Sequence, residues 1–175
     1  KPQSFNFLIT AAIPVNDETK DVSRSMILGD TQNVYASKGS LYVAATDWGN
    51  GYYQPYGSFG TQIYRFALGD GTIEYKSKGK VPGNIINQFS MDESNGTFRI
   101  ATTKNEYDPD DKMSNGVYVF DQAMKLKGKI EGIAEGEKIY STRFLGNRLY
   151  MVTFKTVDPL FVIDVSEPKN PYVLG

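Results

Sequence analysis

The feature that most constrains this fold is an apolar segment that occurs three times in the chain. The copies are residues 41–46 (LYVAAT), 98–103 (FRIATT) and 149–154 (LYMVTF). A second apolar segment recurs in the same order, at residues 63–66, 117–120 and 160–163. Short runs rich in aromatic and β-branched residues and bounded by turn residues predict strands. Two strands that repeat in the same order indicate a repeat architecture.

Residues 139–175 form the clearest single unit. Three apolar runs, at 140–145, 149–154 and 160–165, are separated by Gly146-Asn147 and by residues 157–159, and a fourth run opens at Tyr172. This pattern predicts an antiparallel meander. Four strands in a unit of roughly 40 to 57 residues are typical of one blade of a propeller.

The predicted fold class is therefore all-β, a partial β-propeller with about three and a half four-stranded antiparallel blades in residues 1–175. The predicted parts are a half blade at 4–28, whole blades at 34–81 and 86–130, and a truncated blade at 140–175. Because propellers close with four to eight blades, we expect a fragment of a larger propeller. The alternative is that the half blade pairs with the truncated one. The chain opens on Lys1 rather than Met, so a processed or excised form is expected.

Composition excludes several classes of chemistry. The chain has no Cys and no His, so it cannot build a Cys–His or Ser–His–Asp nucleophile or an ordinary zinc or copper site by itself. Nineteen basic and twenty acidic residues give a net charge of −1, so nucleic acid is not an expected partner. No apolar run reaches eighteen residues, and no membrane insertion is expected.

Two segments carry a family resemblance: residues 87–93 (NQFSMDE) with 99–103, and residues 157–164 with Pro168 and Pro171. They resemble the bacterial and archaeal secreted proteins with a C-terminal β-propeller distantly related to WD-repeat (WD40-like) propellers. Residues 161–175 are also similar to the LVIVD repeat, a short surface-propeller motif. The resemblance implies export or cell-surface placement, hence an extracellular location, and it assigns no reaction.

We label the four strands of a blade a to d from the inside outward. The longest irregular segment joins strands b and c of the first whole blade. It carries the only Trp, and its candidate ligand-binding residues are Trp48, Tyr52, Tyr53, Tyr56 and Phe59. Exposed aromatic rings there would stack on sugars or anchor a protein partner. The alternative is that they cover the blade edge as a small core.

The same b-to-c position in the next blade is acidic. Asp108, Asp110 and Asp111 offer the hard oxygen ligands that calcium requires, although the segment lacks the Gly and Glu of an EF-hand, and a solvated loop is the alternative. No other cofactor is expected. Because both segments join b to c, we expect them to share one rim of the propeller.

Other polar patterns favour structural roles. Lysine triplets at 76, 78, 80 and at 125, 127, 129 are predicted to protect outer edge strands, with polyanion binding as the alternative. Asp121 and Asp164 follow c strands and are predicted to form turns rather than a catalytic pair. Asn95-Gly96 is predicted to be a turn, although Asn95 also opens a glycosylation sequon.

The leading functional hypothesis is a non-enzymatic binding or scaffold module of an exported protein that recognises a protein or glycan through the b-to-c rim. The alternative is a carboxylate-dependent polysaccharide hydrolase or lyase, which needs two carboxylates about 5 to 10 Å apart. A third hypothesis is self-association through exposed blade faces.

Overall fold

The computed structural model describes residues 6–17, 19–29, 31–47, 60–105, 112–154 and 159–175. Within that part the chain forms strands and one short 3-10 helix. In chain order the elements are β1 (Phe7–Ala12), β2 (Ser23–Leu28), β3 (Thr31–Ala36), β4 (Ser40–Asp47), β5 (Gly60–Leu68), β6 (Ile73–Pro82), η1 (Gln88–Ser90), β7 (Met91–Ser94), β8 (Thr97–Lys104), β9 (Ser114–Phe120), β10 (Leu126–Ile133), β11 (Lys138–Leu145), β12 (Arg148–Phe154), β13 (Leu160–Asp164) and β14 (Tyr172–Val173).

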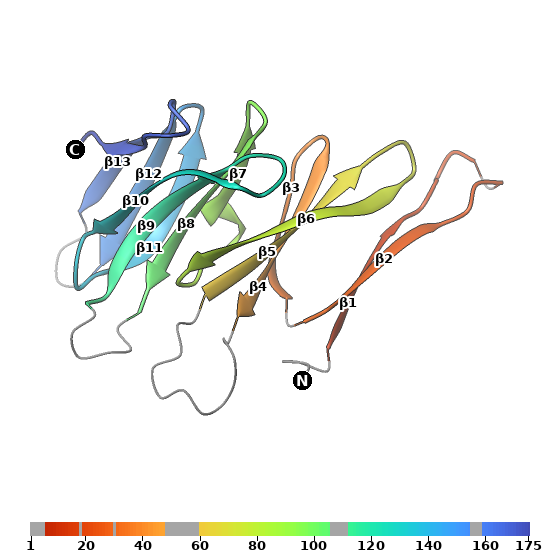
Figure 1. Cartoon of the computed structure of the whole chain (residues 1–175), viewed down its shortest axis with the longest axis horizontal. Coiled ribbons are helices and arrows are strands. Elements are labelled where there is room, and N and C mark those ends of the chain that lie inside the picture. The colour runs from red at the N-terminus through yellow and green to blue at the C-terminus, as the bar shows by residue number, and fades with distance from the viewer. Residues whose placement is uncertain (1–5, 18, 30, 48–59, 106–111, 155–158) are drawn as a thin grey trace.

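These strands build four antiparallel sheets in which sequence neighbours pair. The sheets are β1-β2, β3-β4-β5-β6, β7-β8-β9-β10 and β11-β12-β13-β14. Figure 1 shows them side by side in chain order, from β1-β2 at the right to the C-terminal sheet at the left. The fold class is confirmed: the chain is a partial β-propeller with three four-stranded sheets and one two-stranded sheet.

The Asn95-Gly96 turn is confirmed. Ser94 pairs with Thr97 across it, and both central residues have positive φ, 49° at Asn95 and 71° at Gly96. This is the type I′ geometry that Asn-Gly favours, because its twist matches that of the flanking strands. The sequence therefore determines the register of β7 against β8 locally.

The two inner sheets, β3-β4-β5-β6 and β7-β8-β9-β10, each bury one face against the preceding sheet and the other against the following sheet; we call these the back face and the forward face. Between the first two four-stranded sheets, the ring of Tyr42 stacks on Phe98 with centroids 4.2 Å apart. Burial raises the pKa of Tyr42 to about 12, so the phenol stays neutral in this layer. Complete burial of one such side chain contributes about 1.5–3 kcal/mol, so these layers hold the sheets together.

The sequence Lys-Gly-Lys occurs at residues 78–80 and again at 127–129, and packing explains the glycine in both copies. A Cβ at Gly79 in β6 would lie 3.1 Å from the Met124 side chain, and one at Gly128 in β10 would lie 2.4 Å from the carbonyl oxygen of Pro168. In both copies the glycine lets an outer strand approach the c-to-d connection of the next sheet. The repeat therefore records a contact between blades.

Candidate binding surface at the b-to-c rim

The strand ends beside the two predicted binding segments lie at one edge of the molecule. β4 ends at Asp47 and β5 begins at Gly60, while β8 ends at Lys104 and β9 begins at Ser114; these ends lie along the lower edge in Figure 1. We call this edge the b-to-c rim. The predicted ligand residues Trp48, Tyr52, Tyr53, Tyr56 and Phe59 and the predicted calcium ligands Asp108, Asp110 and Asp111 lie outside the described residues.

Hydrogen bonds and an ion pair fix the rim in the first four-stranded sheet. Nζ of Lys80 lies 2.7 Å from Oδ2 of Asp47, and the Thr61 hydroxyl donates to the Gly83 carbonyl oxygen at 2.8 Å. Gly60 is buried, and a Cβ there would lie 2.6 Å from the Val81 carbonyl oxygen. Both strand ends that flank residues 48–59 are thus tied to the outer strand β6.

A buried network fixes the rim in the second four-stranded sheet. The Thr103 hydroxyl donates to Oδ1 of Asn115 at 2.8 Å and accepts from the backbone N–H of Ile139 at 3.0 Å. The Asn115 amide in turn donates to the carbonyl oxygens of Ile133 and Glu137 at 3.0 and 3.2 Å. Asn115 is 1% exposed, so this network joins β8, β9 and the following sheet without help from solvent.

Sequence reasoning missed Thr103 and Asn115. The signal available was two polar side chains at the ends of otherwise apolar strands, beside a long irregular segment. Such residues usually indicate solvent exposure; here the polar groups satisfy backbone groups that the sheets leave unpaired.

Residues 87–93, which carry part of the family resemblance, have a mainly structural role. The Asn87 side chain caps η1 by accepting from the Phe89 N–H at 2.9 Å. The Ser90 hydroxyl lies 3.0 Å from the Thr142 hydroxyl, and both are buried. Oε2 of Glu93 accepts from the Ser37 hydroxyl at 2.5 Å. These contacts join the β3–β4 turn to β7 and η1 to β11, so the segment positions three neighbouring sheets.

Phe89 is the exception in this segment. Its ring is 46% exposed, and the Arg143 guanidinium lies 4.8 Å above the ring centroid. Ile86, also exposed, precedes it in the connection from β6 to η1. The contact is a cation–π interaction at a half-exposed ring, and sequence reasoning did not single it out.

The predicted placement of the first lysine triplet is confirmed: β6 is an edge strand on which Lys76, Lys78 and Lys80 are exposed at alternating positions. Their protective role stays a prediction. In the second copy Lys125 precedes β10, so only Lys127 and Lys129 lie in the strand. Several of these lysines contact nearby acids: Glu74 lies 2.6 Å from Lys76. Within the described residues, no three His, Cys, Asp or Glu side chains group closely enough to hold a metal ion.

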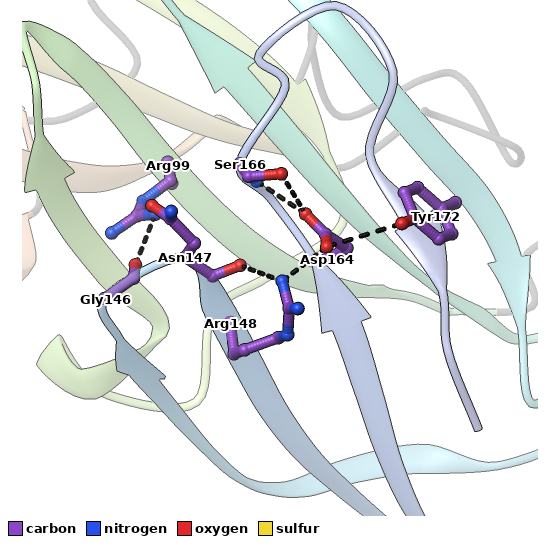
Figure 2. Close-up of polar contacts among 7 residues, drawn as sticks. All are labelled: Arg99, Gly146, Asn147, Arg148, Asp164, Ser166 and Tyr172. Atoms are coloured by element: carbon purple, nitrogen blue, oxygen red, sulfur yellow. Dashed lines mark hydrogen bonds and ion pairs between the residues drawn. The ribbon is translucent and has the colours of Figure 1, made fainter.

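The turn prediction for Asp121 and Asp164 is confirmed. Oδ1 of Asp121 accepts from the Lys125 N–H at 2.9 Å. Asp164, which is buried, accepts from the N–H of Ser166 at 2.8 Å and from its hydroxyl at 2.5 Å. Figure 2 shows that Arg148 and Tyr172 also donate to this carboxylate. The Asp164 oxygens are therefore occupied within the fold.

Asp164 makes stability dependent on pH. The Ser166 hydroxyl and N–H, with Arg148 nearby, lower the pKa of Asp164 below its ordinary value of 3.8. A lowered folded-state pKa adds stability that is fully present at neutral pH and is lost as pH falls through the folded pKa. We expect Asp164→Asn to lower the urea midpoint at pH 7 and to make the midpoint fall less steeply than in the wild type as pH drops below 4.

The control is Asp70→Asn, a substitution at a fully exposed side chain. Its urea midpoint is expected to fall with pH as in the wild type. If the midpoint fell equally steeply with pH in all three proteins, the prediction would be contradicted.

The four sheets, their cores and the rim define a β-propeller module. The chain belongs to the Beta propeller domain family, whose model matches residues 1–175. This confirms the resemblance at the level of the propeller family; secretion, the WD40-like relation and the LVIVD-like motif stay predictions.

The similar proteins come from archaea. The chain is 49% identical over 104 residues to an uncharacterized protein of Methanocaldococcus jannaschii, a match that covers 59% of this chain and 17% of the relative. It is 41% identical over 115 residues to an uncharacterized protein of Archaeoglobus fulgidus, covering 66% of this chain and 17% of the relative. The matched part is thus about a sixth of each relative's length. No solved structure matches the chain. Among the described residues, no helix is long and apolar enough to cross a membrane.

Proposed function

We propose that this chain is a non-enzymatic binding or scaffold module of an exported or cell-surface protein, and that it recognises a protein or glycan through the b-to-c rim. A β-propeller is in general a binding or scaffold fold, but its function depends on the particular site that it carries. Export rests on the family resemblance of residues 87–103 and 157–171.

The proposal rests on one observation: the strand ends on both sides of the segment with the predicted aromatic ligand residues are held in place by contacts with other strands. Asp47 and Gly60 flank that segment, and both belong to strand ends held by buried backbone packing and the Lys80 ion pair. The neighbouring strand ends are held by Thr103 and Asn115. Loops that start and finish on fixed strand ends lose less entropy on binding, which is why binding residues concentrate on loops of rigid scaffolds.

Charge also bears on the ligand class. The net charge is −1, and two of the cations described near the rim contact acids: Lys80 contacts Asp47, and Lys112 lies 3.3 Å from Glu135. A polyanion would have to displace those acids. Aromatic stacking on a neutral sugar face or on an apolar protein side chain needs no such exchange.

The test is to measure ligand capture by the wild-type chain and by Trp48→Ala and Tyr53→Ala variants, with a glycan array and a pull-down from cell-surface extract. Removal of a central aromatic anchor is expected to weaken capture about thirtyfold. Lys38→Ala, in the β3–β4 turn at the opposite ends of the strands, is the matched control and is expected to bind like wild type. Repeating the capture assays with added calcium or with a chelator tests whether Asp108, Asp110 and Asp111 bind calcium. If neither assay captures a ligand, or if all variants bind equally, the proposal is wrong.

A further inference from the structure

The triplet Asn95-Gly96-Thr97 has no part in the proposed binding surface. Asn95 is the only asparagine of the chain that is followed two residues later by Ser or Thr. An asparagine with a hydroxyl residue at that spacing is the acceptor for N-glycosylation in exported proteins, and such acceptors lie in surface segments. The triplet therefore meets the sequence requirement, and the remaining requirement is an accessible side chain.

The structure places Asn95 at the tip of the turn between β7 and β8, where its side chain is exposed. Among the described residues, the Asn95 side-chain amide has no hydrogen-bond partner. The space beside the turn is open, because a Cβ added to Gly96 would find only the Gln122 side chain within 4 Å, at 3.8 Å. A sugar joined to Asn95 would project into solvent without displacing a described part of the chain.

The fold does not require this triplet in the turn. The corresponding turns of the other two four-stranded sheets contain Lys38-Gly39 and Gly146-Asn147. Neither turn has an asparagine with a hydroxyl residue two positions later. The Thr97 hydroxyl donates to the Ser94 carbonyl oxygen at 2.7 Å, a contact that the third sheet makes without, since Arg148 begins its second strand. Asn-Gly explains the turn, but the turn alone does not explain the whole triplet.

The turn lies at the opposite ends of the strands from the b-to-c rim. Strand β8 runs for eight residues from Thr97 to Lys104, so about 25 Å separates the turn from the rim. The sheet that carries the turn has a described sheet on each side (Figure 1), so the exposure of Asn95 does not come from a missing neighbouring sheet. A sugar on Asn95 would leave the b-to-c rim open to its ligand.

We infer that Asn95 is an N-glycosylation site, which receives an oligosaccharide from a donor that carries it on a lipid phosphate. Nδ2 of Asn95 forms a bond with the anomeric carbon of the first sugar and gives up one proton. The bond between that carbon and the phosphate oxygen breaks, and the lipid phosphate leaves with the bonding electrons. The Thr97 hydroxyl is engaged with Ser94 in the folded turn, so the transfer precedes closure of this turn. The inference rests on the proposed export, because such acceptors are used in exported proteins.

The experiment analyses the full-length protein from its native host, after the cell-surface and cytoplasmic fractions have been separated. Trypsin releases residues 81–99, which contain Asn95. Mass spectrometry with fragmentation is expected to find this peptide heavier by a whole number of sugar residues, joined to Asn95. Residues 144–148 provide an internal control, because they contain Asn147, an exposed turn asparagine with no hydroxyl residue two positions later. That peptide is expected to be unmodified.

Three variants test whether the triplet directs the modification. Asn95→Asp keeps a residue that tolerates the turn geometry but lacks the amide, and Thr97→Val lacks the hydroxyl; both are expected to lose the added mass completely. Thr97→Ser keeps the hydroxyl and is expected to keep the added mass. A sugar that persists in Thr97→Val would contradict the inference.

The two fractions separate this inference from the proposed function. Wild-type protein in the cell-surface fraction with an unmodified peptide 81–99 would overturn the inference and leave the proposed binding function standing. Protein recovered only from the cytoplasmic fraction would overturn the proposed export and the glycosylation together.

Discussion

Replacement of Arg99 by alanine is expected to destabilise the fold more than any other change to a charged residue described here. Arg99 lies on β8 and is 3% exposed. Its Nε and Nη2 donate to Oδ2 of Asp92, Nη1 donates to the Gly146 carbonyl oxygen at 2.8 Å, and the guanidinium lies 5.2 Å from the Phe144 ring centroid. Gly146 and Phe144 belong to the next sheet, so one side chain links two blades (Figure 2).

Removing one partner of a buried ion pair costs about 3–5 kcal/mol, because the other charge is left without compensation. The Asp92 side chain is 23% exposed and gains solvent when Arg99 is removed, so the low end of this range, about 3 kcal/mol, is expected. For a chain of this size each kcal/mol lowers Tm by about 2–4 °C, so Arg99→Ala is expected to lower Tm by about 10 °C. Scanning calorimetry measures the change.

Two control variants test whether the loss of stability comes from the buried position of Arg99 and from its charge. Lys76→Ala removes an exposed ion pair with Glu74 and is expected to cost less than about 1 kcal/mol. The double variant with Asp92→Ala is expected to recover part of the loss, because no unpaired charge then remains at the partly buried Asp92 position. A loss for Arg99→Ala no greater than that for Lys76→Ala would show that the contact between sheets is unimportant.

The fold was largely predictable because its information is local and repeated. Alternating apolar residues in 149–154 and 160–163 define strands without reference to the rest of the chain, and Asn95-Gly96 defines a turn through its own φ angles. The repeat then supplies the connectivity, because sequence neighbours pair in every sheet. Most contacts that span sheets left no such local pattern; the repeated glycines Gly79 and Gly128, which let outer strands approach the next sheet, are an exception.

The frame of the site was not predictable for that reason. Thr103 and Asn115 are ordinary polar residues in the sequence, and they acquire their role only when β11 lies beside β8 and β9. The same holds for residues 87–93, which carry part of the family resemblance and whose polar groups mostly serve the packing of sheets. The predicted aromatic ligand residues were chosen from sequence composition, whereas the contacts that hold the flanking strand ends follow from tertiary structure.

The most direct test of the contact between sheets compares two equivalent glycines. Gly83 and Gly132 close the repeated segments 76–83 and 125–132, and their φ angles are nearly equal, at 77° and 75°. A Cβ at Gly83 would lie 2.3 Å from the Thr103 carbonyl oxygen, whereas a Cβ at Gly132 would have no neighbour within 4 Å. The backbone strain of an alanine is thus matched, and only the contact with β8 differs.

Gly132→Ala is expected to cost about 1–2 kcal/mol, the cost of a left-handed φ for a residue with a Cβ. Gly83→Ala carries the same cost and must also displace the backbone bridge between Asn84 and Thr103, whose two hydrogen bonds are each 2.9 Å. Overpacking of this kind adds about 1–3 kcal/mol, so the urea midpoint is expected to fall about twice as far for Gly83→Ala. Thr103 also accepts a hydrogen bond from the Ile139 N–H in the rim network, so amide hydrogen exchange at Ile139 is expected to become faster in Gly83→Ala and not in Gly132→Ala. Equal urea midpoints and equal exchange rates in the two variants would show that β8 can move without destabilising the fold.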